Sequence, residues 1–180
     1  MILQTKNKNL QNIAKERLMP VIPFTDGDLA MNDDGFFSDN QQKRLKPKTD
    51  LYIALSGIGA FVGFVLTAIF FYVGQNSDRF FLPTLVSITA FGISFYGVFW
   101  GLALSNKIKK GYGVKKVEGF AELSLTYGGK NNDIPYYRMK ISGINFHLNE
   151  KTYDAFAEGE YRVYYFPLLR NALLSVEPIG

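Results

Sequence analysis

Residues 51–74 read LYIALSGIGAFVGFVLTAIFFYVG, and residues 82–105 read LPTLVSITAFGISFYGVFWGLALS. Neither stretch contains an Asp, Glu, Lys, Arg or His. As an α-helix each would extend roughly 36 Å, enough to cross a hydrocarbon core of about 30 Å with some tilt. A buried helix of a soluble protein would have to be apolar on every face, twice in succession, in a chain with little other mass to cover it. We therefore predict a transmembrane helical hairpin over residues 51–105, with a loop at residues 75–81.

Basic residues flank this predicted hairpin at both outer ends. The residues before the first helix include Lys43, Arg44, Lys46 and Lys48. The residues after the second helix include Lys107, Lys109, Lys110, Lys115 and Lys116. The loop holds only Arg79, so the positive-inside rule predicts that both termini are cytoplasmic. No basic start with a nearby cleavage site precedes the first helix, which argues against a signal peptide. We expect a multi-pass protein of the plasma (inner) membrane.

Small residues recur in both apolar stretches at the GxxxG spacing. Gly59 and Gly63 form one pair, and Gly97 and Gly101 form the other. In lipid, small residues let two helix backbones approach closely and gain dispersion contacts. Two interpretations remain open: the glycines pack the hairpin against itself, or one glycine face mediates oligomerisation or docks a partner. Because neither span carries an ionisable group, we do not expect an ion pathway, a proton relay or a voltage sensor.

Residues 1–50 are predicted to form a cytoplasmic region of short helices and turns. Residues 7–18 carry apolar side chains at helical spacing, and Pro20 ends the pattern. This basic amphipathic segment either lies on the membrane surface or docks on its own protein. Residues 24–45 predict a compact helix–turn–helix. Two capping boxes and one turn glycine support it: Thr25 with Asp28, Ser38 with Gln41, and Gly35.

The last third of the chain alternates apolar and polar residues as β-strands do. We predict a basic juxtamembrane linker at residues 106–116 and a cytoplasmic β-domain at residues 117–180. The expected strands are residues 121–127, 137–141, 144–148, 161–165 and 172–176, with one helical turn at residues 152–156. About five strands in so short a segment favour a partly closed barrel of SH3-like or OB-like size. The predicted fold is therefore a membrane α-helical hairpin with a small all-β C-terminal domain.

The composition excludes several classes of enzyme. The chain has no Cys and one His, which removes thiol chemistry, disulfides and multi-histidine metal sites. His147 falls on the polar face of its strand, and common nucleotide, metalloprotease and hydrolase motifs are missing. The acidic run at residues 32–35 fails as a calcium loop, because Gln41 would stand at its twelfth position. We predict no catalytic residue, no metal site, no cofactor and no nucleic-acid partner.

Two sets of side chains are candidates for binding. A set on the β-domain offers a surface to a protein partner: Tyr136, Tyr164, Phe166, Leu168 and Leu169. The alternative is that closure of the barrel buries both faces at this point. A second set offers a surface to anionic lipid headgroups: Lys107, Lys109, Lys110, Lys115 and Lys116. Ordinary topogenic charge explains the same lysines.

Two further stretches resemble motifs of a known group of proteins. Residues 24–45 contain T-x-x-DL-x-x-N-x-x-G-x-x-S-x-x-Q-x-x-x-L, and residues 158–178 contain YRVYY-x-P…LLS-x-EP. Together they resemble uncharacterised bacterial two-helix membrane proteins with a motif before the hairpin and a small C-terminal β-module. The resemblance implies that architecture and a bacterial origin, and it carries over no catalytic residues.

These observations favour a non-catalytic, membrane-anchored adaptor or accessory subunit that presents its β-domain to a protein partner. The alternative is a membrane-surface sensor that reads anionic lipid through its lysines. An enzyme is the least supported reading, since no nucleophile, metal or phosphate motif occurs. The expected partners are membrane lipids and another membrane or cytoplasmic protein, with a homo-oligomer as a further option.

Overall fold

The computed structural model describes residues 12–74, 81–129 and 133–179 of the chain. These residues form two compact units, which are described separately. The first, called the β-unit here, combines the described residues up to Gln41 with those from Gly111 onward. The second, called the helical unit, is residues 42–110. This division differs from the predicted one, which separates residues 1–50 from the β-domain.

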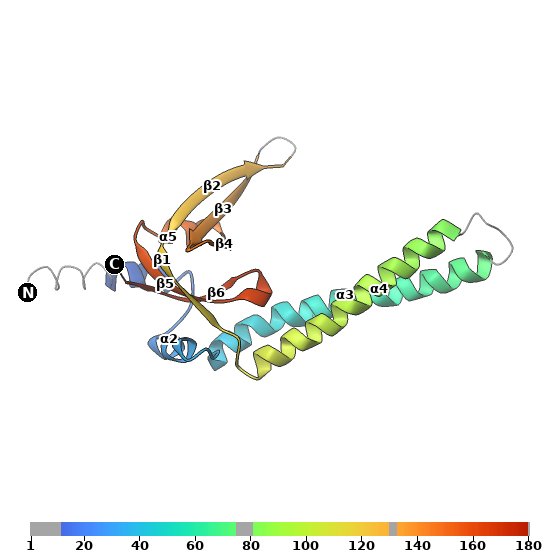
Figure 1. Cartoon of the computed structure of the whole chain (residues 1–180), viewed down its shortest axis with the longest axis horizontal. Coiled ribbons are helices and arrows are strands. Elements are labelled where there is room, and N and C mark those ends of the chain that lie inside the picture. The colour runs from blue at the N-terminus through green and yellow to red at the C-terminus, as the bar shows by residue number, and fades with distance from the viewer. Residues whose placement is uncertain (1–11, 75–80, 130–132, 180) are drawn as a thin grey trace, which may run out of the picture. The chain divides into compact units, whose positions relative to one another are not determined.

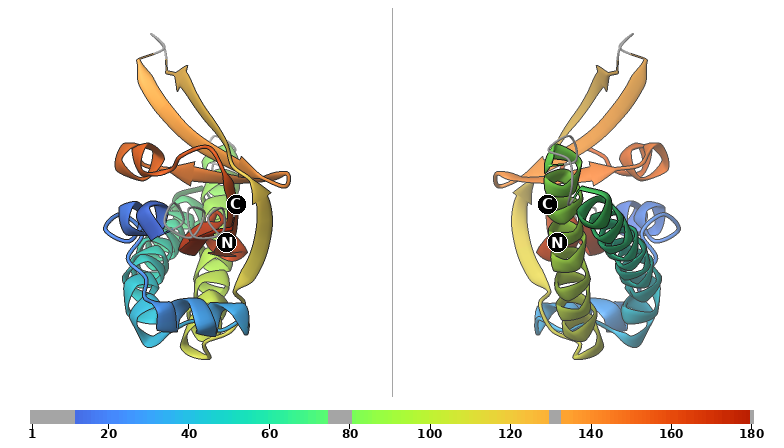
Figure 2. Two further views of the ribbon diagram at one scale, coloured as in Figure 1. Left: turned by 90° about the vertical axis from the view of Figure 1, so that its left-hand side faces the viewer. Right: turned by 90° about the vertical axis from the view of Figure 1, so that its right-hand side faces the viewer.

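The helical unit is built on two long helices, α3 (Asp39–Gly74) and α4 (Phe81–Lys109), which run side by side in Figures 1 and 2. Both extend past the predicted spans at their polar ends, and Pro47 lies within α3 without ending it. Both are long and apolar enough to cross a membrane. Only 6% of the most apolar window of α3 and 17% of that of α4 are buried. Residues 75–80 of the predicted loop lie outside the described residues.

All four glycines of the GxxxG pairs lie in the contact between α3 and α4. A Cβ atom on Gly63 would stand 3.0 Å from the backbone Cα of Phe91, and one on Gly97 would stand 2.8 Å from Ser56 Oγ. The side chains of Ser94 and Ile53 face Gly59 and Gly101 in the same way. The structure therefore shows the first interpretation of these glycines, in which the hairpin packs against itself.

The β-unit contains six strands in two antiparallel sheets, where the sequence predicts five strands. One sheet has the order β1-β5-β6: Lys115–Phe120, Glu160–Phe166 and Ala172–Pro178. The other has the order β2-β3-β4: Glu122–Gly128, Ile134–Ile141 and Ile144–Leu148. Sequence reasoning missed β1 because its two lysines and its glycine look like part of the basic linker. Its strand character comes from pairing along β5 over its whole length.

The core of the β-unit joins both sheets to the N-terminal segment. Met139 and Phe146 from one sheet and Val163 from the other belong to one buried cluster. Leu18 and Phe24 belong to the same cluster, so the described part of the predicted amphipathic segment, residues 12–18, docks on its own protein; residues 7–11 lie outside the described residues. This contact, which joins residues far apart in sequence, is the reason that the predicted boundary at residue 50 does not match the compact unit. Two short helices complete the β-unit: α5 (Glu150–Ala155) and the 3-10 helix η2 (Pro167–Leu169).

The predicted helix–turn–helix is present at its start. The helix α2 (Asp26–Asp33) begins with the capping box of Thr25 and Asp28, and Gly35 has a φ of +85° in the following turn. The second predicted helix is no separate element, because it continues as α3. Between the two helices, Phe37 N–H donates to Gly111 O at 2.8 Å and so ties this turn to the chain that leads into β1.

Candidate functional site

Three side chains from distant parts of the β-unit form a buried polar group, called the amide cluster here: Asn32, Gln41 and Ser175. The amides of Asn32 and Gln41 exchange two hydrogen bonds, each of 2.8 Å. Ser175 Oγ donates to Asn32 Oδ1 at 2.6 Å, and Gln41 Nε2 donates to Leu174 O at 3.4 Å. Buried polar atoms are costly when unpaired, so this closed set of bonds specifies one arrangement of α2, the first turn of α3 and β6.

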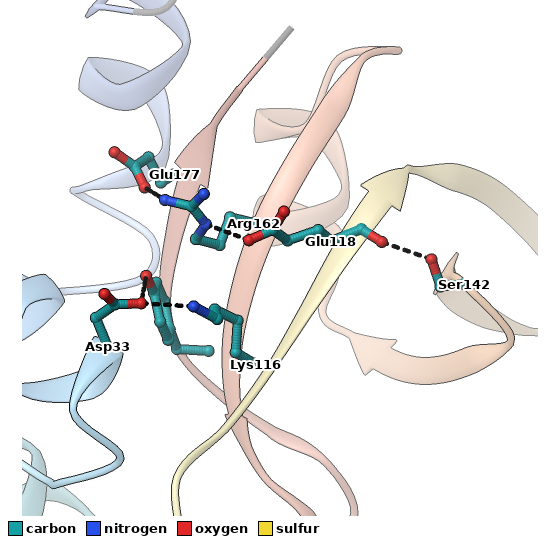
Figure 3. A network of polar contacts seen from close by, with 7 residues as sticks. Asp33, Lys116, Glu118, Ser142, Arg162 and Glu177 are labelled. Atoms are coloured by element: carbon teal, nitrogen blue, oxygen red, sulfur yellow. Dashed lines mark hydrogen bonds and ion pairs between the residues drawn. The ribbon is translucent and has the colours of Figure 1, made fainter.

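A second set of polar contacts lies nearer the surface and is called the ionic network here; Figure 3 shows it. Asp33 Oδ1 accepts hydrogen bonds from Lys116 Nζ at 2.8 Å and from Tyr164 Oη at 3.1 Å. Arg162 donates through Nε to Glu118 Oε1 at 2.6 Å and through Nη1 to Glu177 Oε2 at 3.0 Å. The network therefore links α2 to all three strands of the β1-β5-β6 sheet. Exposed ion pairs of this kind contribute little each, typically below about 1 kcal/mol.

These contacts perturb the titration of three groups. The hydrogen bond from Lys116, followed by that from Tyr164, lowers the pKa of the Asp33 carboxyl below its ordinary value. Burial, followed by the hydrogen bond to Asp33, raises the pKa of Tyr164 to about 12. The hydrogen bond to Glu118 raises the pKa of the Arg162 guanidinium. All three groups keep their ordinary charge at neutral pH, so none is prepared to transfer a proton there.

Two of the five predicted partner-binding residues are buried. Tyr164 and Phe166 are 2% and 1% exposed, although the alternation of the strand places them away from the core cluster. The second face of β5 is covered by the N-terminal segment, because Tyr164 bonds to Asp33 and Phe166 packs edge-on against Phe37 with ring centroids 5.0 Å apart. Both faces of β5 are therefore buried at this point, as the alternative interpretation stated. The second face is covered by the end of α2 and the turn before α3, and not by closure of a barrel.

The other three predicted partner-binding residues lie in two places. Leu168 is exposed and Leu169 is half-buried in η2, between β5 and β6. Tyr136 lies in the other sheet, near the end of the β2–β3 ribbon that extends past β4 in Figure 2. Its ring covers the backbone of Gly128, where an added Cβ would stand 2.7 Å from Tyr136 Cε2. The structure thus divides these residues between two surfaces.

Tyr136 has exposed apolar neighbours that sequence reasoning did not single out. We call this group the ribbon tip: Tyr127, Ile134 and Tyr136. Their exposed fractions are 59%, 49% and 42%. Ile134 and Tyr136 share one face of β3, and Tyr127 lies on the opposite face of the ribbon. The alternating pattern of β2 predicts an apolar face that includes Tyr127, but only the sheet shows that large apolar side chains remain exposed on both faces of the ribbon end.

The five predicted lipid-binding lysines are divided between the two units. Lys107, Lys109 and Lys110 are exposed at the end of the helical unit, and Lys115 is exposed on β1. Lys116 is also on β1, but its ammonium is engaged by the carboxylate of Asp33. Lys116 would have to leave this exposed ion pair before it bound a headgroup, whereas no ion pair is described for the other four lysines.

No catalytic arrangement was found in the part of the chain that the structure describes. His147 is exposed on β4, and no group of three or more His, Asp or Glu side chains in the described residues is able to hold a metal ion. The residues that the structure brings together are instead those of the two quoted motifs. The polar residues that these motifs specify form the hydrogen bonds and ion pairs given above: Asn32, Gln41, Arg162, Tyr164, Ser175 and Glu177.

Comparisons with known proteins yielded no matching family model, no matching curated protein and no matching solved structure.

Proposed function

We propose that this chain is a non-catalytic, membrane-anchored adaptor or accessory subunit. In this proposal α3 and α4 insert into the plasma (inner) membrane as a hairpin, and the β-unit lies in the cytoplasm. The support for insertion is that both helices are apolar on nearly all faces and have little of that surface covered. The excess of lysine and arginine at the outer ends supports the orientation.

The exposed ribbon tip is the observation that carries the adaptor role. Ile134 and Tyr136 stand on one face at the end of a two-stranded ribbon, Tyr127 lies on the opposite face there, and none of the three belongs to the core cluster. Exposed apolar groups rimmed by polar residues are typical of surfaces that bind a protein. Tyrosine suits such a surface because it buries a large area with few rotatable bonds and keeps a polar end. In this proposal the two sheets of the β-unit form a partly closed barrel of SH3-like or OB-like size.

The test is affinity purification of the tagged, full-length chain from its native membrane in mild detergent, followed by quantitative mass spectrometry. The test variant is Ile134→Ser with Tyr136→Ser, and the matched control is Phe120→Ser, which removes an exposed apolar ring from β1. We expect one stoichiometric protein with the wild type and the control, and its loss with the test variant. In a separate purification, loss of the associated protein with Leu168→Ser would indicate that η2 belongs to the same binding surface.

Two results would overturn the adaptor role. One is recovery of no protein other than the chain itself. The other is equal loss of the associated protein in the ribbon-tip variant and the Phe120→Ser control, which would show a general effect of apolar substitutions. Melting temperatures of all variants, measured in the same detergent, separate lost binding from lost folding.

The alternative, a sensor of anionic lipid, rests on the five predicted lysines, and its test uses the three that are exposed at the end of α4: Lys107, Lys109 and Lys110. Electrostatic attraction to anionic headgroups is about 1 kcal/mol per basic residue and fades at high ionic strength. Changing these three lysines to Gln should reduce the anionic lipid that remains bound after purification, whereas Lys140→Gln, in an ion pair on β3, should not. Retention that is independent of both salt and these lysines would exclude the sensor.

A further inference from the structure

The outer edge of β2 differs from the other three sheet edges of the β-unit. In the β2-β3-β4 sheet, β2 pairs only with β3, and no strand in the described part of the chain pairs with its other side. The strand reads ELSLTYG, without Lys, Arg or Pro, and its pairing with β3 is regular over seven residue pairs. A long, regular edge strand offers a row of unpaired N–H and C=O groups that readily pair with another strand.

Each of the other edges carries a feature that discourages strand addition. The β1 edge carries charged residues and Gly119, whose φ is +151°. The β4 edge is five residues long, and Asn171 Nδ2 donates to its Asn145 O at 2.9 Å. The β6 edge ends in Pro178, and its Leu174 O accepts from Gln41. Natural sheets protect their edges by charge, by proline, by short length and by cover. Of these, β2 has only the charge of Glu122 at its first residue, and that carboxylate is paired with Lys140 of β3.

The sequence of β2 is complementary to itself in antiparallel pairing. When a second copy is centred on Leu125, all seven residues pair, and Leu125 lies opposite Leu125 of the second copy. Leu123 then lies opposite Tyr127 of the second copy on the apolar face, and Ser124 lies opposite Thr126 of the second copy on the polar face. Glu122 lies opposite Gly128 of the second copy, so no like charges meet.

We infer that two copies of this chain associate through the outer edges of β2, in antiparallel register about Leu125, and so form one continuous six-stranded sheet. The pairing satisfies the free backbone groups of both edges. It also covers Leu125 and Tyr127, which are 40% and 59% exposed in the single chain. This inference goes beyond the adaptor role and does not depend on it. Tyr127 belongs to both surfaces, but the ribbon-tip variant changes only Ile134 and Tyr136, whereas the edge pairing is tested by cysteines in β2 with a different readout.

Single cysteines test the register, because the natural chain contains no Cys and gives no background. In the proposed pairing, residues directly opposite have Cα atoms about 4.5–5.5 Å apart, within the range that a disulfide spans. Leu125→Cys should therefore form a covalent dimer with itself. Ser124→Cys or Thr126→Cys alone should not, since each would lie roughly 8 Å from its own copy. A mixture of the Ser124→Cys and Thr126→Cys chains should form a covalent heterodimer.

The measurement uses the full-length chain in mild detergent, oxidised with copper phenanthroline and separated on a non-reducing gel. Asn145→Cys, on the exposed β4 edge, is the matched control and should stay monomeric. We expect at least a tenfold larger dimer fraction for Leu125→Cys than for Asn145→Cys. No dimer from Leu125→Cys, with the wild-type melting temperature, would overturn the inference. Equal dimer fractions in Leu125→Cys, Ser124→Cys and Thr126→Cys would also overturn it, because they would indicate random collision.

Discussion

Asn32 and Gln41 face each other with their side-chain amides antiparallel, so that each donates one hydrogen bond of 2.8 Å to the other. Asn32 belongs to α2, and Gln41 belongs to the first turn of α3. Ser175 on β6 adds a third bond to the pair. The start of α3 is thereby held to the sheet of the β-unit by buried polar contacts, and an amide pair of this kind has one satisfied geometry.

Removal of the Asn32 amide should destabilise the β-unit. Asn32→Ala leaves the buried polar atoms of Gln41 and Ser175 short of partners, at about 1–3 kcal/mol for each group. We expect a melting temperature lower by roughly 4–24 °C in mild detergent, at about 2–4 °C for each kcal/mol. Asn40→Ala, which changes an exposed residue of the same turn, should leave it unchanged. Equal melting temperatures for the two variants would show that the cluster adds nothing.

The ionic network should make stability depend on pH through Asp33. Because the hydrogen bonds from Lys116 and Tyr164 lower the pKa of Asp33, its carboxylate stabilises the fold above the ordinary pKa of Asp. That stabilisation is lost as the pH falls through the lower, folded-state pKa. Asp33→Asn should therefore melt below the wild type at pH 7, and the difference should shrink below about pH 4. Asp34→Asn is the control, and a pH-independent deficit in Asp33→Asn would contradict the argument.

Two adjacent phenylalanines at the turn before α3 differ in burial, and their substitution should therefore differ in its effect on stability. Phe37 is 1% exposed and packs edge-on against Phe166, whereas Phe36 is 49% exposed. Phe37→Ala should destabilise the β-unit by about 3–5 kcal/mol, because it removes a buried ring and leaves a cavity. Phe36→Ala should cost much less. Thermal denaturation of both variants, side by side, checks the order, and similar losses would mean that Phe37 is not part of the core.

Two glycines in α3 should respond in opposite ways to alanine. Alanine in place of glycine within a helix improves helix propensity by up to about 1 kcal/mol, and a Cβ on the half-buried Gly57 would have no atom within 4 Å. The same Cβ on Gly63 would press on the backbone of Phe91, which cannot rotate away. Gly63→Ala should therefore lower the melting temperature in detergent, and Gly57→Ala should maintain or raise it. A neutral Gly63→Ala would show that α3 and α4 are farther apart than described.

The helical unit was the most predictable part of the chain. The absence of charge over residues 51–74 and 82–105 places two membrane-length helices, and the GxxxG spacing identifies the glycines that meet between them. The helix ends were less predictable. Ser38 and Gln41 mark a helix start, but only the continuous backbone of α3 shows that this start and the apolar span belong to one helix.

The candidate sites were only partly predictable. Alternation along β2, β3, β4, β5 and β6 identified those strands, whereas β1 carries a weak pattern and is defined by its partner β5. Strand alternation correctly places Tyr164 and Phe166 on the face of β5 away from the core cluster. The prediction that they are exposed there was wrong, because it assumed that nothing covers this face of the sheet. The turn between α2 and α3 covers that face, and the exposed apolar residues lie instead at the ribbon tip.

By itself, the sequence determined the features that depend on neighbouring residues: the two apolar helices, the capping boxes and most of the strands. Hydropathy, hydrogen bonding at a helix end and alternation are properties of short segments, so they can be read within a few residues. The tertiary structure alone decided which polar side chains meet and which apolar ones remain exposed. Asn32 and Ser175 are 143 residues apart in the chain, and their contact depends on how the whole β-unit closes around its core.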